Sequence, residues 1–219
     1  MIITIDGPSG TGKSTVARGL ADSLGITYFD TGALYRAISW KILKEGIAYH
    51  EKEELLSLLK AFSYRIQTID EEKHYFVGKT DVTMAIRSPE VTAIVSEVSA
   101  LKEVREALKP LQINFSKEID AVFEGRDLGT VVFPHADIKF YLIARPEVRA
   151  ERRYKELQQK FPDQTFSRQK TLQEIESRDK SDSTREIAPL RQADDAILVD
   201  TSDLTVEEVV LKLREIVQK

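Results

Sequence analysis

The sequence predicts an α/β fold in which helices cover both faces of a parallel β-sheet, and two observations carry this prediction. Short apolar segments at residues 2–6, 121–124, 138–143 and 196–200 alternate with longer segments of helical periodicity. Strands buried on both faces of a parallel sheet show such continuous apolar runs, and a helix returns the chain between them. A glycine-rich turn at residues 7–12, between the first strand and the first helix, fits the same order.

The first part of the chain continues this alternation as far as residue 59. The predicted elements are a helix over about 13–24, an extended segment at 27–29, a helix from about residue 31 and a helix at 53–59. Each strand is short and each helix has one apolar face, as expected for a sheet whose helices pack against it.

A change of periodicity then marks a small insertion. Residues 63–68 and 74–77 alternate between apolar and polar with a period of two, and residues 70–73 have the composition of a hairpin turn. Residues 82–86 are a candidate third strand. We therefore expect an antiparallel insertion over roughly 63–87, apart from the main sheet.

Helical signals return in the second part of the chain. Ser88 and Pro89 form an N-cap followed by proline at the first helical position, and helical patterning runs to about residue 116 with a possible break near Leu101. Another helix opens at Pro146. Near the end, Thr205 and Glu208 have the spacing of a capping box before the last helix.

Composition excludes several classes of protein. The chain has 219 residues and a net charge of −4, which argues against a groove for polymeric nucleic acid or an affinity for anionic membranes. It has no cysteine, its three histidines lie far apart, and no apolar run approaches the ~18 residues of a membrane helix. We expect a monomer of the cytoplasm that binds small molecules.

The turn after the first strand matches the phosphate-binding pattern G-x4-GK[ST]. Glycines there let backbone N–H groups surround a phosphate chain, and the following helix adds partial positive charge. Lys13 can reach the outer phosphates of ATP, and the Ser14 hydroxyl can ligate Mg²⁺. The expected ATP contacts are Gly7, Pro8, Ser9, Gly10, Thr11, Gly12, Lys13, Ser14 and Thr15. A GTPase is disfavoured because the only asparagine, Asn114, is followed by Phe115 and forms no base-reading NKxD motif.

Two segments at predicted strand ends are candidates for binding a second substrate, the molecule that accepts a phosphoryl group from ATP. Thr31 can cap the helix that follows the second strand, and Arg36 lies one turn further on. Arg126 and Asp127 follow the strand at 121–124, and ligands of parallel sheets bind at the carboxyl ends of strands. The alternatives are a capped helix with a surface arginine and a structural ion pair.

A series of charged residues predicts a lid. Three arginines, Arg149, Arg152 and Arg153, precede a polar loop at 158–166, and a second group, Arg178, Asp179, Asp182 and Arg185, follows it. Arginines that close over a migrating phosphoryl group stabilise its charge. The alternative is a solvated basic face paired with Glu147 and Glu151.

These segments together resemble the bacterial cytidylate kinases, of the longer form, over essentially the whole chain. The matching segments are IDGPSGTGKST, FDTGALYR, EGRDLGTVVFP, RAERR and RDKSDSTREIAPL. The resemblance implies a P-loop kinase core with an antiparallel insertion and a helical lid. We expect one domain with a core at about 1–60, 101–145 and 186–219, an acceptor insertion at about 61–100 and a lid at about 146–185.

The resemblance also implies a role for each matching residue. Ser96, Arg105 and Asp127 would recognise cytosine; Thr31, Arg36 and Arg126 would hold the acceptor phosphate; and Arg178, Asp182 and Arg185 would contact its sugar and phosphate. Lys13, Arg126, Arg149 and Arg153 would stabilise charge during direct in-line transfer from ATP, with Mg²⁺, to CMP and dCMP. The alternatives are a related kinase with another acceptor and a nucleotide-binding regulatory protein.

Overall fold

The computed structural model describes residues 1–70, 72–117 and 119–218, which form two compact units. The first unit contains residues 1–29 and 116–219, and the second contains residues 30–115. The segment 61–100, expected as an acceptor insertion, lies inside the second unit. Among the described residues, no helix combines the length and the apolar character needed to cross a bilayer.

A five-stranded sheet forms the centre of the first unit, in the order β2-β6-β1-β7-β8. Its strands are β1 (Ile2–Asp6), β2 (Thr27–Asp30), β6 (Ala121–Glu124), β7 (Ile138–Ile143) and β8 (Ile197–Asp200). The strand β1 pairs in parallel with both β6 and β7, and β7 pairs in parallel with β8. The predicted α/β fold with a parallel sheet is therefore confirmed.

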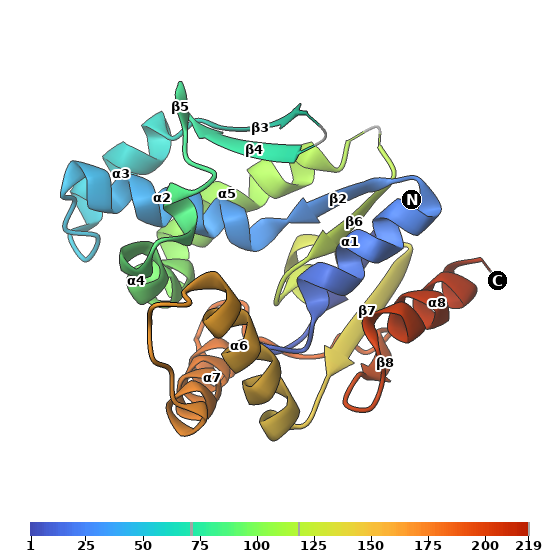
Figure 1. Cartoon of the computed structure of the whole chain (residues 1–219). Helices are drawn as coiled ribbons and strands as arrows, with labels where there is room; N and C mark the ends of the chain where they lie inside the picture. The colour runs from blue at the N-terminus through green and yellow to red at the C-terminus, as the bar shows by residue number, and fades with distance from the viewer. Residues whose placement is uncertain (71, 118, 219) are drawn as a thin grey trace. The chain divides into compact units, whose positions relative to one another are not determined.

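Helices of the first unit follow β1, β7 and β8, as the alternation predicted, and a further helix comes directly after the one that follows β7. They are α1 (Lys13–Leu24), α6 (Pro146–Lys160), α7 (Arg168–Thr184) and α8 (Val206–Val217), with a short helical turn, η2, at Leu128–Val132. Helices α1 and α8 lie side by side, as do α6 and α7 (Figure 1). Buried residues of α1 and α8, including Leu20 and Leu213, join Ile5 and Phe140 of the sheet in one hydrophobic core. The capping box of Thr205 and Glu208 is present.

Because the paired strands are parallel, their carboxyl ends meet at one edge of the sheet. The glycine-rich loop follows β1, the segment Gly125–Asp127 follows β6, and the turn into α6 follows β7. Ligands of such sheets bind at this edge. The fold therefore gathers three segments that the sequence singled out.

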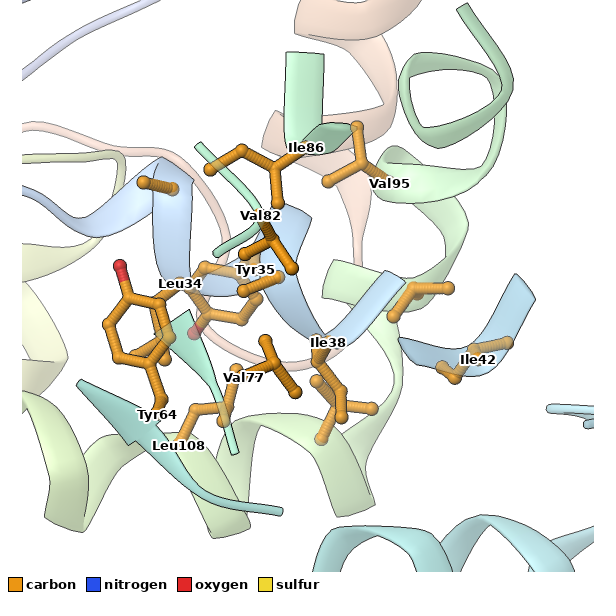
Figure 2. Packing of buried hydrophobic residues seen from close by; sticks show 14 of the residues in the cluster. Leu34, Tyr35, Ile38, Ile42, Tyr64, Val77, Val82, Ile86, Val95 and Leu108 are labelled. Atoms are coloured by element: carbon orange, nitrogen blue, oxygen red, sulfur yellow. The ribbon is translucent and has the colours of Figure 1, made fainter. Parts of the chain in front are cut away.

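The second unit has its own core, which Figure 2 shows from close by. Its helices are α2 (Thr31–Glu45), α3 (Lys52–Ala61), α4 (Pro89–Ala100) and α5 (Lys102–Phe115), and its antiparallel sheet contains β3 (Tyr64–Ile69), β4 (Glu72–Val77) and β5 (Thr80–Asp81). Leu34 and Ile38 of α2 pack with Val77 and Leu108 in this core. The break near Leu101 is confirmed, since α4 ends at Ala100.

One predicted strand is wrong. Residues 82–86 do not continue the small sheet, because β5 covers only Thr80–Asp81 and a 3-10 turn, η1, follows at Ala85–Arg87. The Ile86 N–H donates to the Val82 carbonyl at 2.9 Å, and both side chains are fully buried. Residues four apart lie on the same face of a helical turn and also on the same face of a strand, so the apolar pattern alone does not distinguish the two. Within the predicted hairpin turn at 70–73, Glu71 lies outside the described residues.

Candidate active site

The glycine-rich loop after β1 is held against β7 and α6. At Gly7, with φ of 147°, a Cβ atom would lie 2.1 Å from the Leu142 carbonyl oxygen. At Gly10, with φ of 77°, a Cβ atom would lie 3.0 Å from the Cβ of Arg149. Both positions therefore require glycine for conformation and for space. The loop is fixed closely enough to present its backbone to a phosphate chain.

Lys13 begins α1 and is 5% exposed. Its ammonium group donates to the Pro8 carbonyl at 2.6 Å, across the loop. Burial lowers the pKa of Lys13 to about 7, and the positive charges of Arg126 and Arg178 contribute in the same direction. A phosphate chain at the loop would reverse this shift, because a nearby negative charge favours the charged ammonium.

A magnesium ion fits this site only together with a nucleotide. Ser14 and Thr15 are exposed in the first turn of α1, so the Ser14 hydroxyl is available as a ligand. Within the described ranges, no group of three or more His, Cys, Asp or Glu side chains could hold a metal by itself. Mg²⁺ is commonly bound through one or two protein oxygens and substrate phosphates, which is the arrangement Ser14 can supply.

Asp6 joins the glycine-rich loop to the segment that carries Arg126 and Asp127. One carboxylate oxygen of Asp6 accepts the Leu128 N–H at 3.1 Å, and the other accepts the Gly129 N–H at 2.8 Å. Burial raises the pKa of Asp6 to about 7, against the effect of these two hydrogen bonds. The carboxylate therefore links the end of β1 to the segment that follows β6, directly before the glycine-rich loop begins.

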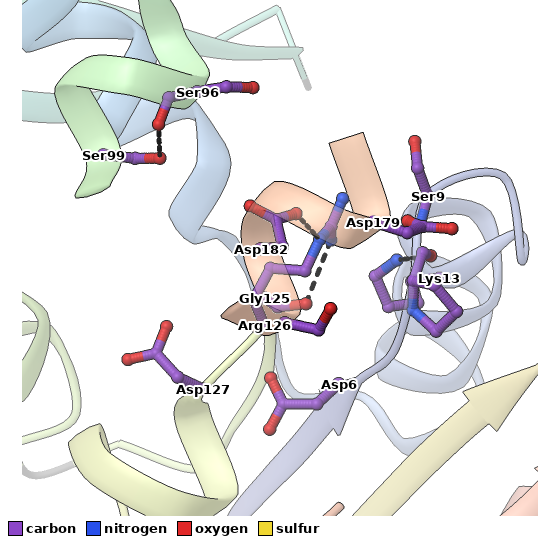
Figure 3. Close-up of polar contacts among 12 residues, drawn as sticks. Asp6, Ser9, Lys13, Ser96, Ser99, Gly125, Arg126, Asp127, Asp179 and Asp182 are labelled. Atoms are coloured by element: carbon purple, nitrogen blue, oxygen red, sulfur yellow. Dashed lines mark hydrogen bonds and ion pairs between the residues drawn. The ribbon is translucent and has the colours of Figure 1, made fainter. Parts of the chain in front are cut away.

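Two ion pairs link this segment to α7 and to Arg185 just after it, and Figure 3 shows the pair of Arg126 with Asp182. The Arg126 Nε donates to Asp182 at 3.1 Å, and Arg185 pairs with Asp127, also at 3.1 Å. Burial would lower the pKa of Arg126, but the carboxylates of Asp182 and Glu124 raise it overall. Four residues expected at one site therefore do lie together.

The remaining arginines of the predicted lid differ in their surroundings. Arg149 is buried against the glycine-rich loop, where its Nη1 donates to the Ser9 carbonyl at 2.9 Å. Arg153 is partly exposed and pairs with Glu156 at 2.8 Å. Burial, together with the charge of Arg126, lowers the pKa of Arg178 to about 10, and its Nε has no hydrogen-bond partner in the part of the chain that the structure describes.

The acceptor residues of α2 lie in the second unit. The expectation that Thr31 caps α2 is wrong, because Asp30 is the N-cap and accepts the Ala33 N–H at 3.0 Å. Thr31 is instead the first helical residue and is buried. Asp30 also pairs with Arg87 at 2.7 Å, so this carboxylate is fixed on both sides. Arg36 donates to Thr92 Oγ1 at 2.9 Å.

Arg105 and Ser96 also belong to the second unit. Arg105 is 6% exposed, donates to the Ser99 carbonyl at 2.9 Å and lies over the Tyr35 ring at 5.3 Å. Ser96 is half-buried on α4, where its carbonyl accepts the Ser99 hydroxyl at 3.0 Å (Figure 3). The Arg105 side chain is thus held in place inside this unit, and the role of Ser96 and Arg105 in reading cytosine stays a prediction.

Four residues organise the loop in ways that the sequence did not predict: Arg152 and Asp179 were expected only as members of the charged lid series, and Asp6 and Thr201 had no expected role. Asp6 anchors the β6 segment, and Asp179 accepts the Ser9 N–H at 2.8 Å. Arg152 donates to the Thr201 carbonyl at 2.6 Å, while the Thr201 hydroxyl donates to the Thr11 carbonyl at 3.1 Å. A carboxylate at the last position of a buried strand was the available signal for Asp6. The partners of Thr201 lie far away in sequence and give no local signal.

The fold and the charges around the loop define the class of this chain. A parallel sheet, a phosphate-binding loop with a buried lysine, and arginines around it are the features of a P-loop kinase.

Comparisons with known proteins give the family. A family model described as cytidylate kinase matches residues 3–219. A cytidylate kinase from Protochlamydia amoebophila is 53% identical over 217 residues, covering 98% of this chain and 95% of that protein. One from Carboxydothermus hydrogenoformans is 46% identical over 217 residues, covering 99% and 97%. The chain belongs to the cytidylate kinase family.

A solved structure supports the fold alone. An uncharacterized protein from Eubacterium ventriosum aligns with a TM-score of 0.52 and 12% identity, covering 100% of this chain and 98% of that one.

Proposed function

We propose that this protein transfers the γ-phosphoryl group of ATP to CMP, and to dCMP, producing ADP and the cytidine diphosphate. The observation that carries the proposal is the buried Lys13 at the end of the glycine-rich loop, whose ammonium donates to the Pro8 carbonyl at 2.6 Å and feels the positive charges of Arg126 and Arg178. A cluster of this charge suits two phosphorylated substrates that meet with their phosphates facing each other. Membership of the cytidylate kinase family supports cytidine as the nucleoside.

The proposed reaction is a direct in-line transfer without a covalent enzyme intermediate. An ionised phosphate of the acceptor attacks the γ-phosphorus, the bond to the bridging oxygen breaks, and ADP leaves. No general base is needed, so positioning and charge stabilisation supply most of the catalysis. Lys13, Arg126, Arg149 and Arg153 supply the positive charge, and Mg²⁺ ligated by Ser14 would reduce the charge of the ATP phosphates.

We propose the following contacts for the acceptor. Its phosphate would be held by Thr31, Arg36 and Arg126, its sugar and phosphate by Arg178, Asp182 and Arg185, and its base by Ser96, Arg105 and Asp127. Cytosine offers an amino donor, a ring nitrogen and a carbonyl, which an acceptor carboxylate together with arginine and serine donors can satisfy. Uracil replaces the amino group by a carbonyl, which a carboxylate would repel.

The state of the protein in the cell is a further part of the proposal. We propose that it works as a monomer in the cytoplasm, on small nucleotides and not on polymers; the negative net charge supports the last of these points. Light scattering after gel filtration would test the monomer, since a mass near twice 24.9 kDa would contradict it.

A coupled ADP-release assay tests the function. ATP and Mg²⁺ are offered with CMP, dCMP, UMP, AMP, GMP or shikimate as acceptor. We expect strong turnover of CMP and dCMP and poor turnover of UMP. Turnover of a different acceptor alone would retain the kinase but overturn the cytosine assignment, and silence with every acceptor would favour a regulatory nucleotide-binding protein.

A further inference from the structure

Asp179 on α7 lies against the glycine-rich loop although it belongs to the lid. One oxygen of its carboxylate accepts the Ser9 N–H at 2.8 Å, and the other pairs with the guanidinium of Arg149 (Figure 3 shows the Ser9 side of this contact). Arg149 in turn donates to the Ser9 carbonyl at 2.9 Å. The three residues thus form a closed ring in which both backbone polar groups of Ser9 are bonded to lid side chains.

The ring is held in place on every side. The side chains of Arg149 and Asp179 are 8% and 17% exposed, so their charges are largely removed from water. The Arg149 Nε donates to the Ala144 carbonyl at 3.1 Å, at the start of the turn into α6. Close packing at Gly10, where a Cβ atom would meet Arg149 at 3.0 Å, leaves little room for movement of this arginine relative to the loop.

The chemistry of the ring makes Asp179 the residue that orients the other two. A carboxylate can accept from the Ser9 N–H and from Arg149 at the same time, one oxygen for each. An amide in its place has one oxygen and one N–H₂ group, and the N–H₂ group would face either Ser9 or Arg149 as a second donor. Only a carboxylate therefore closes the ring without leaving one partner unmatched.

We propose that Asp179 is a positioning residue of phosphoryl transfer. It fixes the Arg149 guanidinium relative to the Ser9 peptide, so that the glycine-rich loop and this arginine keep one arrangement of charge around the transferred group. The inference rests on the proposed function, because it assumes that Arg149 acts on the transferred phosphoryl group. Asp179 itself acts through Arg149 and Ser9. It differs in this from Asp182, three residues along the same helix, which pairs with Arg126.

A double-mutant cycle in the full-length protein tests the proposal. The variants are Asp179→Asn, Asp179→Ala, Arg149→Ala and Asp179→Ala combined with Arg149→Ala, measured for kcat, for KM of ATP and CMP, and for thermal unfolding. We expect each Asp179 variant to lower kcat on the order of 10²-fold, as misplacement of a reacting geometry does, while KM for CMP changes by less than about threefold. Asp163→Asn, an exposed position in the loop between α6 and α7, is the matched control and should retain wild-type kcat.

The cycle separates positioning from a purely structural role. If Asp179 acts through Arg149, adding Asp179→Ala to Arg149→Ala should lower kcat by less than about threefold more, because the interaction is already lost. The proposal would be overturned if the kcat losses of the two single alanine variants were fully additive in the double variant, or if kcat were unchanged in Asp179→Asn. Should Asp179→Ala fail to fold, Asp179→Asn and Arg149→Ala in single and combined form give the same test. An inactive wild-type protein would instead refute the proposed function.

Discussion

Particular arginines of the candidate site have different surroundings in the two units. In the first unit Arg126 pairs with Asp182 of α7, and Arg149 pairs with Asp179 of the same helix. In the second unit Arg105 donates to a backbone carbonyl and lies over the Tyr35 ring. The first arrangement pairs charge with charge, whereas the contacts of Arg105 with the Ser99 carbonyl and the Tyr35 ring set the direction of its guanidinium.

This difference suggests two uses of the same side chain. Phosphoryl transfer needs several positive charges close together, and such charges repel one another unless carboxylates lie between them. Recognition of a base needs donors in a fixed direction, which a buried guanidinium on a ring face provides. Substitutions in the first unit should therefore change kcat, and those in the second should change KM and selectivity.

The largest effect should come from Lys13→Ala, which removes the buried ammonium of the glycine-rich loop. We expect kcat to fall by at least about 10³-fold, because the loop loses the charge that faces the outer phosphates. Lys180→Ala, an exposed position on α7, is the matched control. Turnover near the wild-type level in Lys13→Ala, measured by ADP release, would remove this lysine from the mechanism and break the contrast between the units.

Arg105→Lys should separate selectivity from rate. A lysine keeps the positive charge but lacks the planar fork that can donate in two directions. We expect KM for CMP to rise about 10- to 100-fold with a smaller change in kcat, and the preference for CMP over UMP to shrink. Arg65→Lys, at an exposed position of β3 in the same unit, serves as the control. A loss confined to kcat would place Arg105 with the charge-stabilising arginines instead.

Much of the fold could be predicted from the sequence because its signals are local. The glycine-rich loop, the cap at Ser88 and the box of Thr205 and Glu208 each occupy a few adjacent residues, and the structure contains all three elements. The helical turn near Val82 was missed because two buried residues four apart also fit an irregular strand.

The candidate site was predictable only in part, for a related reason. Arg126 and Asp182 stood out because each lies in a short charged segment, but their pairing joins residues 56 positions apart. The bonds of Asp179 to Ser9 and of Thr201 to Thr11 join even more distant positions. Such contacts follow from how the strands and lid helices pack, which no spacing in the sequence records.

A smaller effect should come from Asp6→Asn, which tests the anchor between β1 and β6. Both oxygens of Asp6 accept backbone N–H groups, so an amide would bring a donor against a donor, at a cost of about 1–3 kcal/mol in the free energy of unfolding. Burial raises the pKa of Asp6 to about 7, so the folded state binds the extra proton below that pH. The stability this gives is full below about pH 4 and is lost as the pH rises through 7.

Urea unfolding at pH 5 and pH 8 measures this dependence. We expect the wild-type protein to lose stability relative to Asp6→Asn between these values. Asp22→Asn, exposed on α1, is the control and should show no such change. If the wild-type protein instead becomes more stable relative to Asp6→Asn at pH 8, the two backbone hydrogen bonds outweigh burial, and the pKa of Asp6 lies below its ordinary value.

The smallest effect should come from Glu151→Gln, at a second ion pair between α6 and α7. Glu151 of α6 pairs with Arg168 of α7 at 2.6 Å, the same two helices that Arg149 and Asp179 join, but the two side chains are 35% and 66% exposed. Water screens such a pair, so we expect the unfolding temperature to shift by less than about 2 °C and kcat to stay within about twofold. A loss of kcat comparable to that of Asp179→Asn would mean that any link between α6 and α7 orders the lid. The particular ring at Ser9 would then have no special role, and burial would not distinguish the two pairs.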